Sequence, residues 1–116
     1  MAKIIIYQKP TCATCRNVYR VLKDSGVDVE SVNYYLQPIP RSKLKELLKK
    51  MDIPARELLR MNEKIYKKLR LGERELSEDE ILDLLTHYPD LIQRPIVERG
   101  QKAILARAVE RIREIV

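Results

Sequence analysis

The chain has 116 residues, of which 45% are hydrophobic and 34% are charged, and its formal net charge is +6. This composition is typical of a folded globular protein and excludes an intrinsically disordered chain. No apolar stretch approaches the roughly 20 residues that a membrane span needs, and the N-terminus lacks the apolar core of a signal peptide, so we expect a cytoplasmic protein with no membrane partner.

The first third of the chain predicts a βαβ unit. An apolar run over residues 3–7 predicts a buried strand, and the pattern over 13–25 predicts a helix that Gly26 ends. Residues 27–35 predict a second strand. The two strands should be parallel and joined by a right-handed connection.

The middle of the chain, about 40–88, has the apolar spacing of helices. Ser42 is placed to cap the first of them, and Ser77 with Glu80 three residues later has the form of a capping box for the last. Lysines alternate here with leucines and isoleucines, which indicates the solvated faces of amphipathic helices. The segment is predicted to be a helical insertion.

The pattern returns to strands near the C-terminus. Residues 95–98 and 103–105 flank a turn at Gly100 and predict an antiparallel hairpin, and residues 107–116 predict a closing amphipathic helix. The order βαβ, helical insertion, ββα, with a CxxC motif after the first strand, predicts an α/β protein. We expect a single domain over 1–116 with the thioredoxin-like fold and a mixed four-stranded sheet.

Two cysteines, Cys12 and Cys15, lie where the first predicted strand passes into its helix. A sulfur at a helix N-terminus faces unpaired backbone N–H groups and the positive end of the helix dipole, and both favour the thiolate. We therefore predict that Cys12 is a nucleophile. Cys15, one helical turn later, is either a resolving thiol within disulfide reach or an inert core residue. Two cysteines this close are too few for a secreted disulfide framework, and nothing nearby completes a metal site.

An ordered set of motifs covers residues 3 to 107 and resembles the glutaredoxin-dependent arsenate reductase family, whose wider relatives include the Spx-type regulators that bind RNA polymerase. The matching residues are Tyr7-x-x-Pro10-x-Cys12-x-Thr14-x-Arg16-Asn17, Tyr35-Leu36 with Pro40, Arg56-x-Leu58-Leu59-Arg60, Tyr66-x-x-Leu69, and His87-x-Pro89-x-Leu91-Ile92-x-Arg94-Pro95-Ile96-Val97.

The resemblance implies an oxyanion site built from arginines of separate segments, at Arg60, Arg94 and Arg107. Arg16, on the first turn of the predicted helix, joins this substrate-binding set, and Pro95 corresponds to the cis-proline that thioredoxin-like folds place beside the active cysteine. The planar fork of arginine binds oxyanion oxygens bidentately and offsets the repulsion between a thiolate and an anion. The implied substrate is arsenate or a similar oxyanion. The positive net charge by itself indicates only an anionic partner, such as a small oxyanion, a nucleic acid or an acidic protein surface.

In the implied reaction, Cys12 attacks arsenic and a second thiol then reduces As(V) to As(III). That thiol is typically glutathione in the family, with glutaredoxin clearing the mixed disulfide. Here Cys15 replaces the usual serine, so the second thiol is internal or external, and the electron donor is glutathione with glutaredoxin, or thioredoxin. Gln8 and Lys9 replace the family's histidine and asparagine, and Ala108 stands where proline is usual. We expect no bound cofactor and no metal.

Two alternatives from other functional classes remain. A general dithiol reductase of the glutaredoxin kind would use the same CxxC to reduce disulfides. In such an enzyme the arginines would form a patch that recognises anionic groups of the substrate. An Spx-type regulator would use the CxxC as a redox switch and bind the RNA polymerase α subunit. We expect no direct contact with nucleic acid, and we expect the lone histidine, His87, to be structural.

Overall fold

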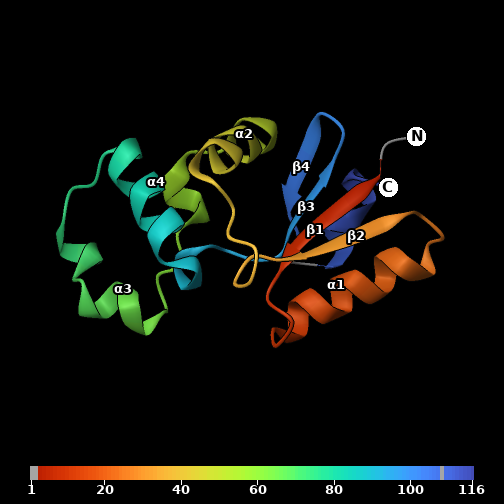
Figure 1. Ribbon diagram of the computed structural model, residues 1–116, viewed down its shortest axis with the longest axis horizontal. Coiled ribbons are helices and arrows are strands. Elements are labelled where there is room, and N and C mark those ends of the chain that lie inside the picture. The colour runs from red at the N-terminus through yellow and green to blue at the C-terminus, as the bar shows by residue number, and fades with distance from the viewer. Residues whose placement is uncertain (1–2, 108) are drawn as a thin grey trace. The chain divides into compact units, whose positions relative to one another are not determined.

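The computed structural model describes residues 3–107 and 109–116. The chain divides into two compact units (Figure 1). Met1–Gln37 and Arg94–Val116 form a sheet unit, and Pro38–Gln93 forms a helical unit. The helices expected within 40–88 are present. The description of the whole chain as one domain with an insertion stays a prediction.

The sheet unit contains a mixed four-stranded sheet in the order β2-β1-β3-β4. Strand β1 pairs in parallel with β2 and antiparallel with β3, and β3 pairs antiparallel with β4. The predicted sheet, its parallel βαβ start and its hairpin are therefore confirmed. The elements are β1 (Ile4–Gln8), α1 (Ala13–Asp24), β2 (Val29–Asn33), β3 (Ile96–Arg99), β4 (Lys102–Leu105) and the 3₁₀ helix η4 (Val109–Glu114).

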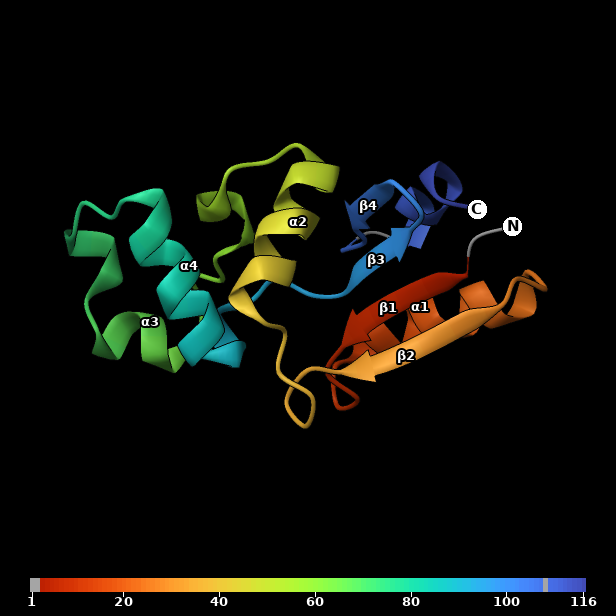
Figure 2. The same ribbon diagram turned by 45° about the horizontal axis from the view of Figure 1, so that its top comes forward.

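One face of this sheet is covered by α1 and η4, and α1 lies along β1 and β2 in both ribbon views (Figure 2). Ile4 and Ile6 of β1 are fully buried against Val18 and Leu22 of α1. Truncating a side chain such as Leu22 to Ala should cost about 2–5 kcal/mol, because it leaves a cavity in a packed core. This core holds the start of α1, and with it the cysteines, against the end of β1.

Two glycines take backbone conformations that favour glycine. Gly26 has a φ of 83° just after α1, where its N–H donates to the Lys23 carbonyl at 3.1 Å. Gly100 has a φ of 59° in the turn between β3 and β4. The sequence predicts Gly26 as the end of a helix and Gly100 as a turn, and both predictions are confirmed. A residue with a Cβ would be strained at either position.

The helical unit is built around α2 and α4, whose buried side chains are Leu44, Leu47 and Leu48 in α2 and Ile81, Leu82 and Leu85 in α4. A short antiparallel bridge joins Leu59 to Ile92. The elements of this unit are α2 (Arg41–Met51), η1 (Ala55–Leu58), α3 (Lys64–Lys68), η2 (Leu71–Glu73), α4 (Glu78–His87) and η3 (Pro89–Leu91).

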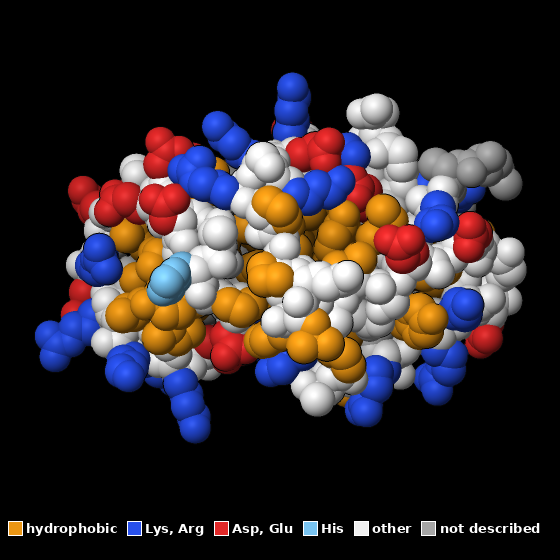
Figure 3. Space-filling model, in the orientation of Figure 1, with side chains coloured by type: hydrophobic (Ala, Val, Ile, Leu, Met, Phe, Trp, Pro, Cys, Tyr) orange, Lys and Arg blue, Asp and Glu red, His pale blue; other side chains and the backbone are white. Residues whose placement is uncertain are grey.

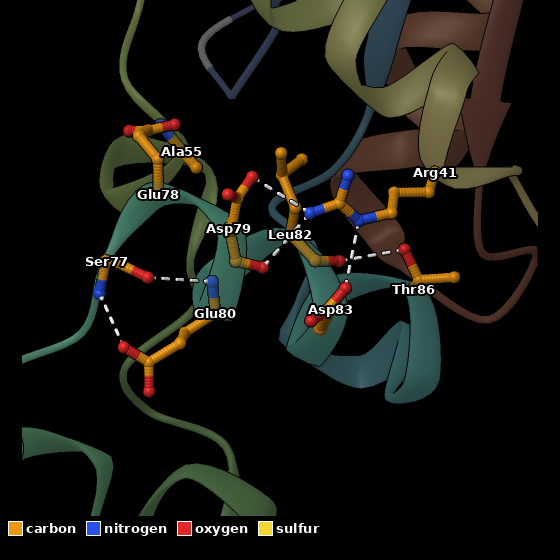
Figure 4. Close-up of polar contacts among 9 residues, drawn as sticks. All are labelled: Arg41, Ala55, Ser77, Glu78, Asp79, Glu80, Leu82, Asp83 and Thr86. Carbon is orange, nitrogen blue, oxygen red and sulfur yellow. Dashed lines mark hydrogen bonds and ion pairs between the residues drawn. The ribbon is translucent and has the colours of Figure 1, made fainter.

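The start of α4 is fixed by polar contacts (Figure 4). The Glu80 N–H donates to Ser77 Oγ at 3.2 Å and the Ser77 N–H donates to Glu80 Oε1 at 3.1 Å, which confirms the predicted capping box. Arg41 at the start of α2 donates to Asp79 at 3.0 Å and to Asp83 at 2.9 Å. These two ion pairs tie α2 to α4.

The predicted cap of the first helix is wrong. Helix α2 begins at Arg41 after Pro40, which occupies the N-cap position without a side-chain hydrogen bond, so Ser42 lies inside the first turn. Proline presets the backbone for a helix start and removes one N–H that would otherwise lack a partner.

The closing helix is of the 3₁₀ type and begins at Val109, and Ala108 lies outside the described residues.

No helix of the described chain is long and apolar enough to cross a membrane. On the face drawn in Figure 3, Lys and Arg side chains project at many points, and Asp and Glu side chains lie between some of them.

Candidate active site

Cys12 occupies the N-cap position of α1, directly after the turn that follows β1. Its backbone is extended, with φ −82° and ψ 122°, and its Sγ accepts a hydrogen bond from the Cys15 backbone N–H at 3.3 Å. The Cys12 N–H donates to the Lys9 carbonyl at 3.0 Å, which closes the turn. The sulfur thus takes the place of the serine or aspartate oxygen that usually caps a helix. This position brings an anionic sulfur to unpaired N–H groups at the positive end of the helix.

The surroundings of Cys12 favour its thiolate. Burial opposes ionisation, but hydrogen bonds from Cys15 and the hydrogen bond and charge of Arg94 outweigh it, so the pKa of the Cys12 thiol lies below its ordinary value. The residue is partly exposed and is not in a disulfide. A partly exposed thiol with a lowered pKa is the form in which cysteine acts as a nucleophile.

Cys15 has the opposite character. Its side chain is completely buried, and burial together with the neighbouring Cys12 raises the pKa of the Cys15 thiol to about 12. It therefore stays protonated at neutral pH, when its S–H can donate to the Cys12 sulfur. The two sulfurs lie at one end of one helix and differ in charge because only Cys12 is placed at the cap.

Arg94 is the arginine that the structure brings to Cys12. It lies in the sheet unit just before β3, and its peptide bond to Pro95 is cis, as the resemblance predicts. The residue is only 9% exposed. Burial opposes its charge, but Tyr34, Tyr35 and Cys12 outweigh burial and raise the pKa of the Arg94 guanidinium. A guanidinium beside a thiolate can bind an anion bidentately and offset the repulsion between that anion and the thiolate.

Sequence reasoning missed the two tyrosines as members of this neighbourhood. Tyr34 and Tyr35 follow β2, and their ring centroids are 5.0 Å apart. Because β1 and β2 are parallel, the segments that follow them lie at the same edge of the sheet, and Lys9 after β1 places its Nζ 5.0 Å from the centre of the Tyr35 ring. The parallel pairing predicted for these strands was a signal that could have grouped the tyrosines with Cys12.

Gln8, which replaces the family's histidine, is held as a structural group. Its side chain is buried, and its Nε2 donates to Ser31 Oγ on β2. An amide transfers no proton near neutral pH, so Gln8 can orient its neighbours but cannot act as a general base.

On the other face of the sheet, the buried Tyr7 hydroxyl donates to Glu98 Oε1 at 2.8 Å, a second contact that the sequence pattern did not indicate.

Arg60 belongs to the helical unit, so its predicted role beside Cys12 stays a prediction. Its backbone N–H donates to the Leu91 carbonyl at 2.7 Å, and its Nε donates to Glu63 Oε1 at 2.9 Å. Arg16 and Arg107 are exposed. Arg16 lies on the first turn of α1, where its N–H donates to the Cys12 carbonyl at 3.1 Å. Their substrate-binding roles also stay predictions.

A groove of about 390 Å³ runs along α4 and contains none of the predicted site residues. It includes His87, whose ring meets that of Tyr88 edge-on at 4.7 Å. Within residues 3–107 and 109–116 there is no group of three His, Cys, Asp or Glu side chains suited to a metal ion.

The comparisons with known proteins agree with this geometry. The model of the ArsC family matches residues 7–115. The uncharacterized protein YfgD of Escherichia coli (strain K12) is 37% identical over 98% of this chain and 97% of its own. The arsenate reductase of the same strain is 36% identical over 99% of this chain and 82% of its own. The solved arsenate reductase of Vibrio cholerae superposes with a TM-score of 0.91 at 31% identity, over 99% of this chain and 98% of its own. The fold is thus that of the solved arsenate reductases, and the chain belongs to the ArsC family.

Proposed function

We propose that the protein is a thiol-dependent oxidoreductase that reduces arsenate to arsenite through Cys12. The observation that carries the proposal is the partly exposed Cys12 sulfur at the N-cap of α1, with a lowered pKa and a buried arginine, Arg94, beside it. Membership of the ArsC family supports an oxidoreductase enzyme of the arsenate reductase type. The cytoplasm keeps thiols reduced, and we place the protein there.

In the first step, the Cys12 thiolate attacks the arsenic atom of a bound arsenate. A sulfur–arsenic bond forms, and one arsenic–oxygen bond breaks with the loss of water once that oxygen is protonated. Arg94 would hold the oxyanion through charge-assisted hydrogen bonds and offset its repulsion by the thiolate. Arg60, Arg107 and Arg16 are the further arginines that we assign to this site from the family match.

In the second step, a thiol attacks the Cys12 sulfur. A disulfide forms, the electron pair of the sulfur–arsenic bond passes to arsenic, and As(V) leaves as As(III). We assign the attacking thiol to Cys15, whose proton passes to the departing arsenite oxygen. The hydrogen bond from the Cys15 N–H to Cys12 Sγ, together with the single helical turn between the two residues, supports this choice. A dithiol donor, thioredoxin or the glutathione–glutaredoxin couple, would then reduce the Cys12–Cys15 disulfide.

The CxxC pair itself favours a second candidate, a general dithiol reductase acting on glutathione-linked or protein disulfides. In that case Arg94 would serve to activate Cys12, and arsenate would not be the substrate. An Spx-type regulator that binds the RNA polymerase α subunit stays a prediction from the resemblance. Arsenate-dependent turnover separates the first function from both of these.

The deciding experiment is arsenate reduction by the purified protein, supplied with glutathione plus glutaredoxin in one assay and with thioredoxin plus its reductase in the other. Turnover with either donor, abolished in Cys12→Ser, is the expected result. Turnover with thioredoxin that is lost in Cys15→Ser would support the internal second thiol. Reduction of disulfides without any arsenate turnover would overturn the arsenate assignment in favour of the dithiol reductase.

A further inference from the structure

Tyr34 is a large side chain with a polar tip, and only 1% of its surface is exposed. Removing a hydroxyl from water costs free energy unless a partner in the protein replaces the water, so a buried tyrosine usually has a polar neighbour. The reaction proposed above assigns no role to this hydroxyl. Its place in the sheet unit indicates which group it serves.

The sheet topology brings Tyr34 to the edge at which Cys12 and Arg94 lie. Strands β1 and β2 are parallel and end together, so Cys12 and Tyr34, which follow them, leave the sheet at the same edge. Strand β3 is antiparallel to β1 and begins at that edge, so Arg94, just before β3, lies there as well. In the order β2-β1-β3 the segments of Tyr34 and Arg94 flank β1. The two flanking strands are about 10 Å apart, which two long side chains can bridge.

The turn that carries Tyr34 is fixed by Asn33. Asn33 Oδ1 accepts a hydrogen bond from the Tyr35 N–H at 3.0 Å, and the Asn33 carbonyl accepts from the N–H groups of Leu36 at 3.1 Å and Gln37 at 2.9 Å. An asparagine that bonds the backbone two residues on is a typical stabiliser of such turns. The Tyr34 ring also contacts the Tyr35 ring, with centroids 5.0 Å apart. Tyr34 is therefore held by its own segment and can orient a neighbour.

That neighbour is Arg94. Burial lowers the pKa of the Arg94 guanidinium, whereas Tyr34, Tyr35 and Cys12 raise it, and of the two tyrosines only Tyr34 does so through a hydrogen bond as well. A guanidinium only donates hydrogen bonds, so the Tyr34 oxygen is the acceptor. The guanidinium that is bonded to Cys12 thus also has Tyr34 as a partner. Arg94 is only 9% exposed, so water is poorly placed to replace a lost acceptor.

We propose that Tyr34 is a positioning residue of the active site. Its hydroxyl holds the Arg94 guanidinium in contact with the Cys12 sulfur, and it affects Cys12 only through Arg94. The inference deepens the proposed function, because it concerns the group that activates Cys12. It does not depend on which substrate Cys12 attacks.

The test measures the pKa of Cys12, from the rate of alkylation by iodoacetamide against pH, in four forms of the full chain: the wild type, Tyr34→Phe, Arg94→Met and the double variant. Tyr34→Phe keeps the buried ring and removes only the hydroxyl. Arg94 is then held less firmly against Cys12, so the thiolate fraction at a pH below the Cys12 pKa should fall roughly two- to fivefold, as expected for one hydrogen bond. In the Arg94→Met background the same change should add nothing, because the residue through which Tyr34 acts is absent.

The chain offers a matched control in Tyr19 of α1, which belongs to the same unit and lies about two helical turns beyond Cys12. Its ring lies near a lysine, as that of Tyr35 does, with Lys23 Nζ 5.9 Å from the ring centroid. Tyr19→Phe removes the same hydroxyl and should leave the Cys12 pKa unchanged. Thermal unfolding of each variant checks that the fold is intact.

Three results would overturn the inference: a Cys12 pKa that is unchanged or lower in Tyr34→Phe, an equal rise in Tyr19→Phe, or a further rise when Tyr34→Phe is added to Arg94→Met. If Tyr34→Phe fails to fold, Asn33→Ala loosens the turn that holds Tyr34, and an unchanged Cys12 pKa in that variant decides against the inference. Arsenate turnover is scored separately. Turnover with an unchanged pKa in Tyr34→Phe refutes only the role of Tyr34, whereas a wild type without turnover refutes the arsenate assignment and leaves the role of Tyr34 to the pKa measurements.

Discussion

Replacing Arg94 by Met should raise the pKa of the Cys12 thiol, because the variant keeps the aliphatic packing of the side chain and removes its charge and its hydrogen bond. A hydrogen bond to a charged group contributes about 1.5–3 kcal/mol, and one pKa unit corresponds to about 1.36 kcal/mol. The hydrogen bonds from Cys15 stay in place and contribute more than Arg94 does. We therefore expect the lower end of this energy range, which corresponds to a roughly tenfold smaller thiolate fraction at a pH below the Cys12 pKa.

The assay is the rate of alkylation by iodoacetamide, a neutral reagent, measured against pH. The measured alkylation is that of Cys12, because Cys15 is completely buried and its pKa is about 12. The matched control is Arg20→Met on the exposed side of α1, where the guanidinium donates to Asn17 Oδ1 at 3.1 Å. An unchanged Cys12 pKa in a folded Arg94→Met protein, or an equal rise in Arg20→Met, would refute the assignment of Arg94 as the activating group.

Mild oxidation should join Cys12 and Cys15, which mass spectrometry would detect as the loss of two hydrogens from the monomer; a lasting glutathione adduct on Cys12 with Cys15 free would contradict this. Arg60→Ala should lower arsenate turnover roughly ten- to a hundredfold while reduction of a neutral disulfide changes little, because each charge-assisted hydrogen bond contributes about 1.5–3 kcal/mol. Arg60→Lys should recover only part of the loss, and equal losses in both reactions would mean that Arg60 supports the fold instead. The raised pKa of Cys15 contributes stability that is complete below its ordinary value of 9.0 and is lost as the pH rises toward about 12. The midpoint of urea unfolding should therefore fall less steeply with pH over that range in Cys15→Ser than in the wild type. An equally steep fall in both proteins would contradict the raised pKa of Cys15.

The fold followed from the sequence because its signals are local. The apolar run of β1, the glycine after α1 and the Ser77–Glu80 pair each act over a few residues, and all three appear where the pattern indicated. The error at Ser42 has a local cause as well. Both Pro40 and Ser42 are acceptable near a helix start, and the pattern alone does not decide which of the two begins it.

The site was predictable only in part, because its chemistry depends on contacts between distant segments. That Cys12 lies at a helix N-terminus is a local property, and its lowered pKa follows in part from that position. The contribution of Arg94 comes from a segment about 80 residues away and was available only through the family match. The hydrogen bond between Arg60 and Glu63 joins residues only three positions apart. A Glu three positions after an Arg is nevertheless common on helical surfaces, so this spacing alone does not predict the contact.

The difference between the pKa values of the two cysteine thiols follows from the position of each residue in the first turn of α1. The N-cap position gives Cys12 the free N–H groups of the helix and the charge of Arg94, whereas Cys15, three residues on, points into the apolar core. A thiolate is the attacking species, so in the proposed reaction Cys12 is the thiol that attacks first at neutral pH. In the mechanism we propose, bonding of the Cys12 sulfur to arsenic removes the negative charge beside Cys15 and with it one of the causes of the raised pKa of Cys15, whereas burial, the largest cause, remains. The proposed reaction would therefore run in a fixed order, because burial and the charge on Cys12 together keep Cys15 protonated before Cys12 has reacted.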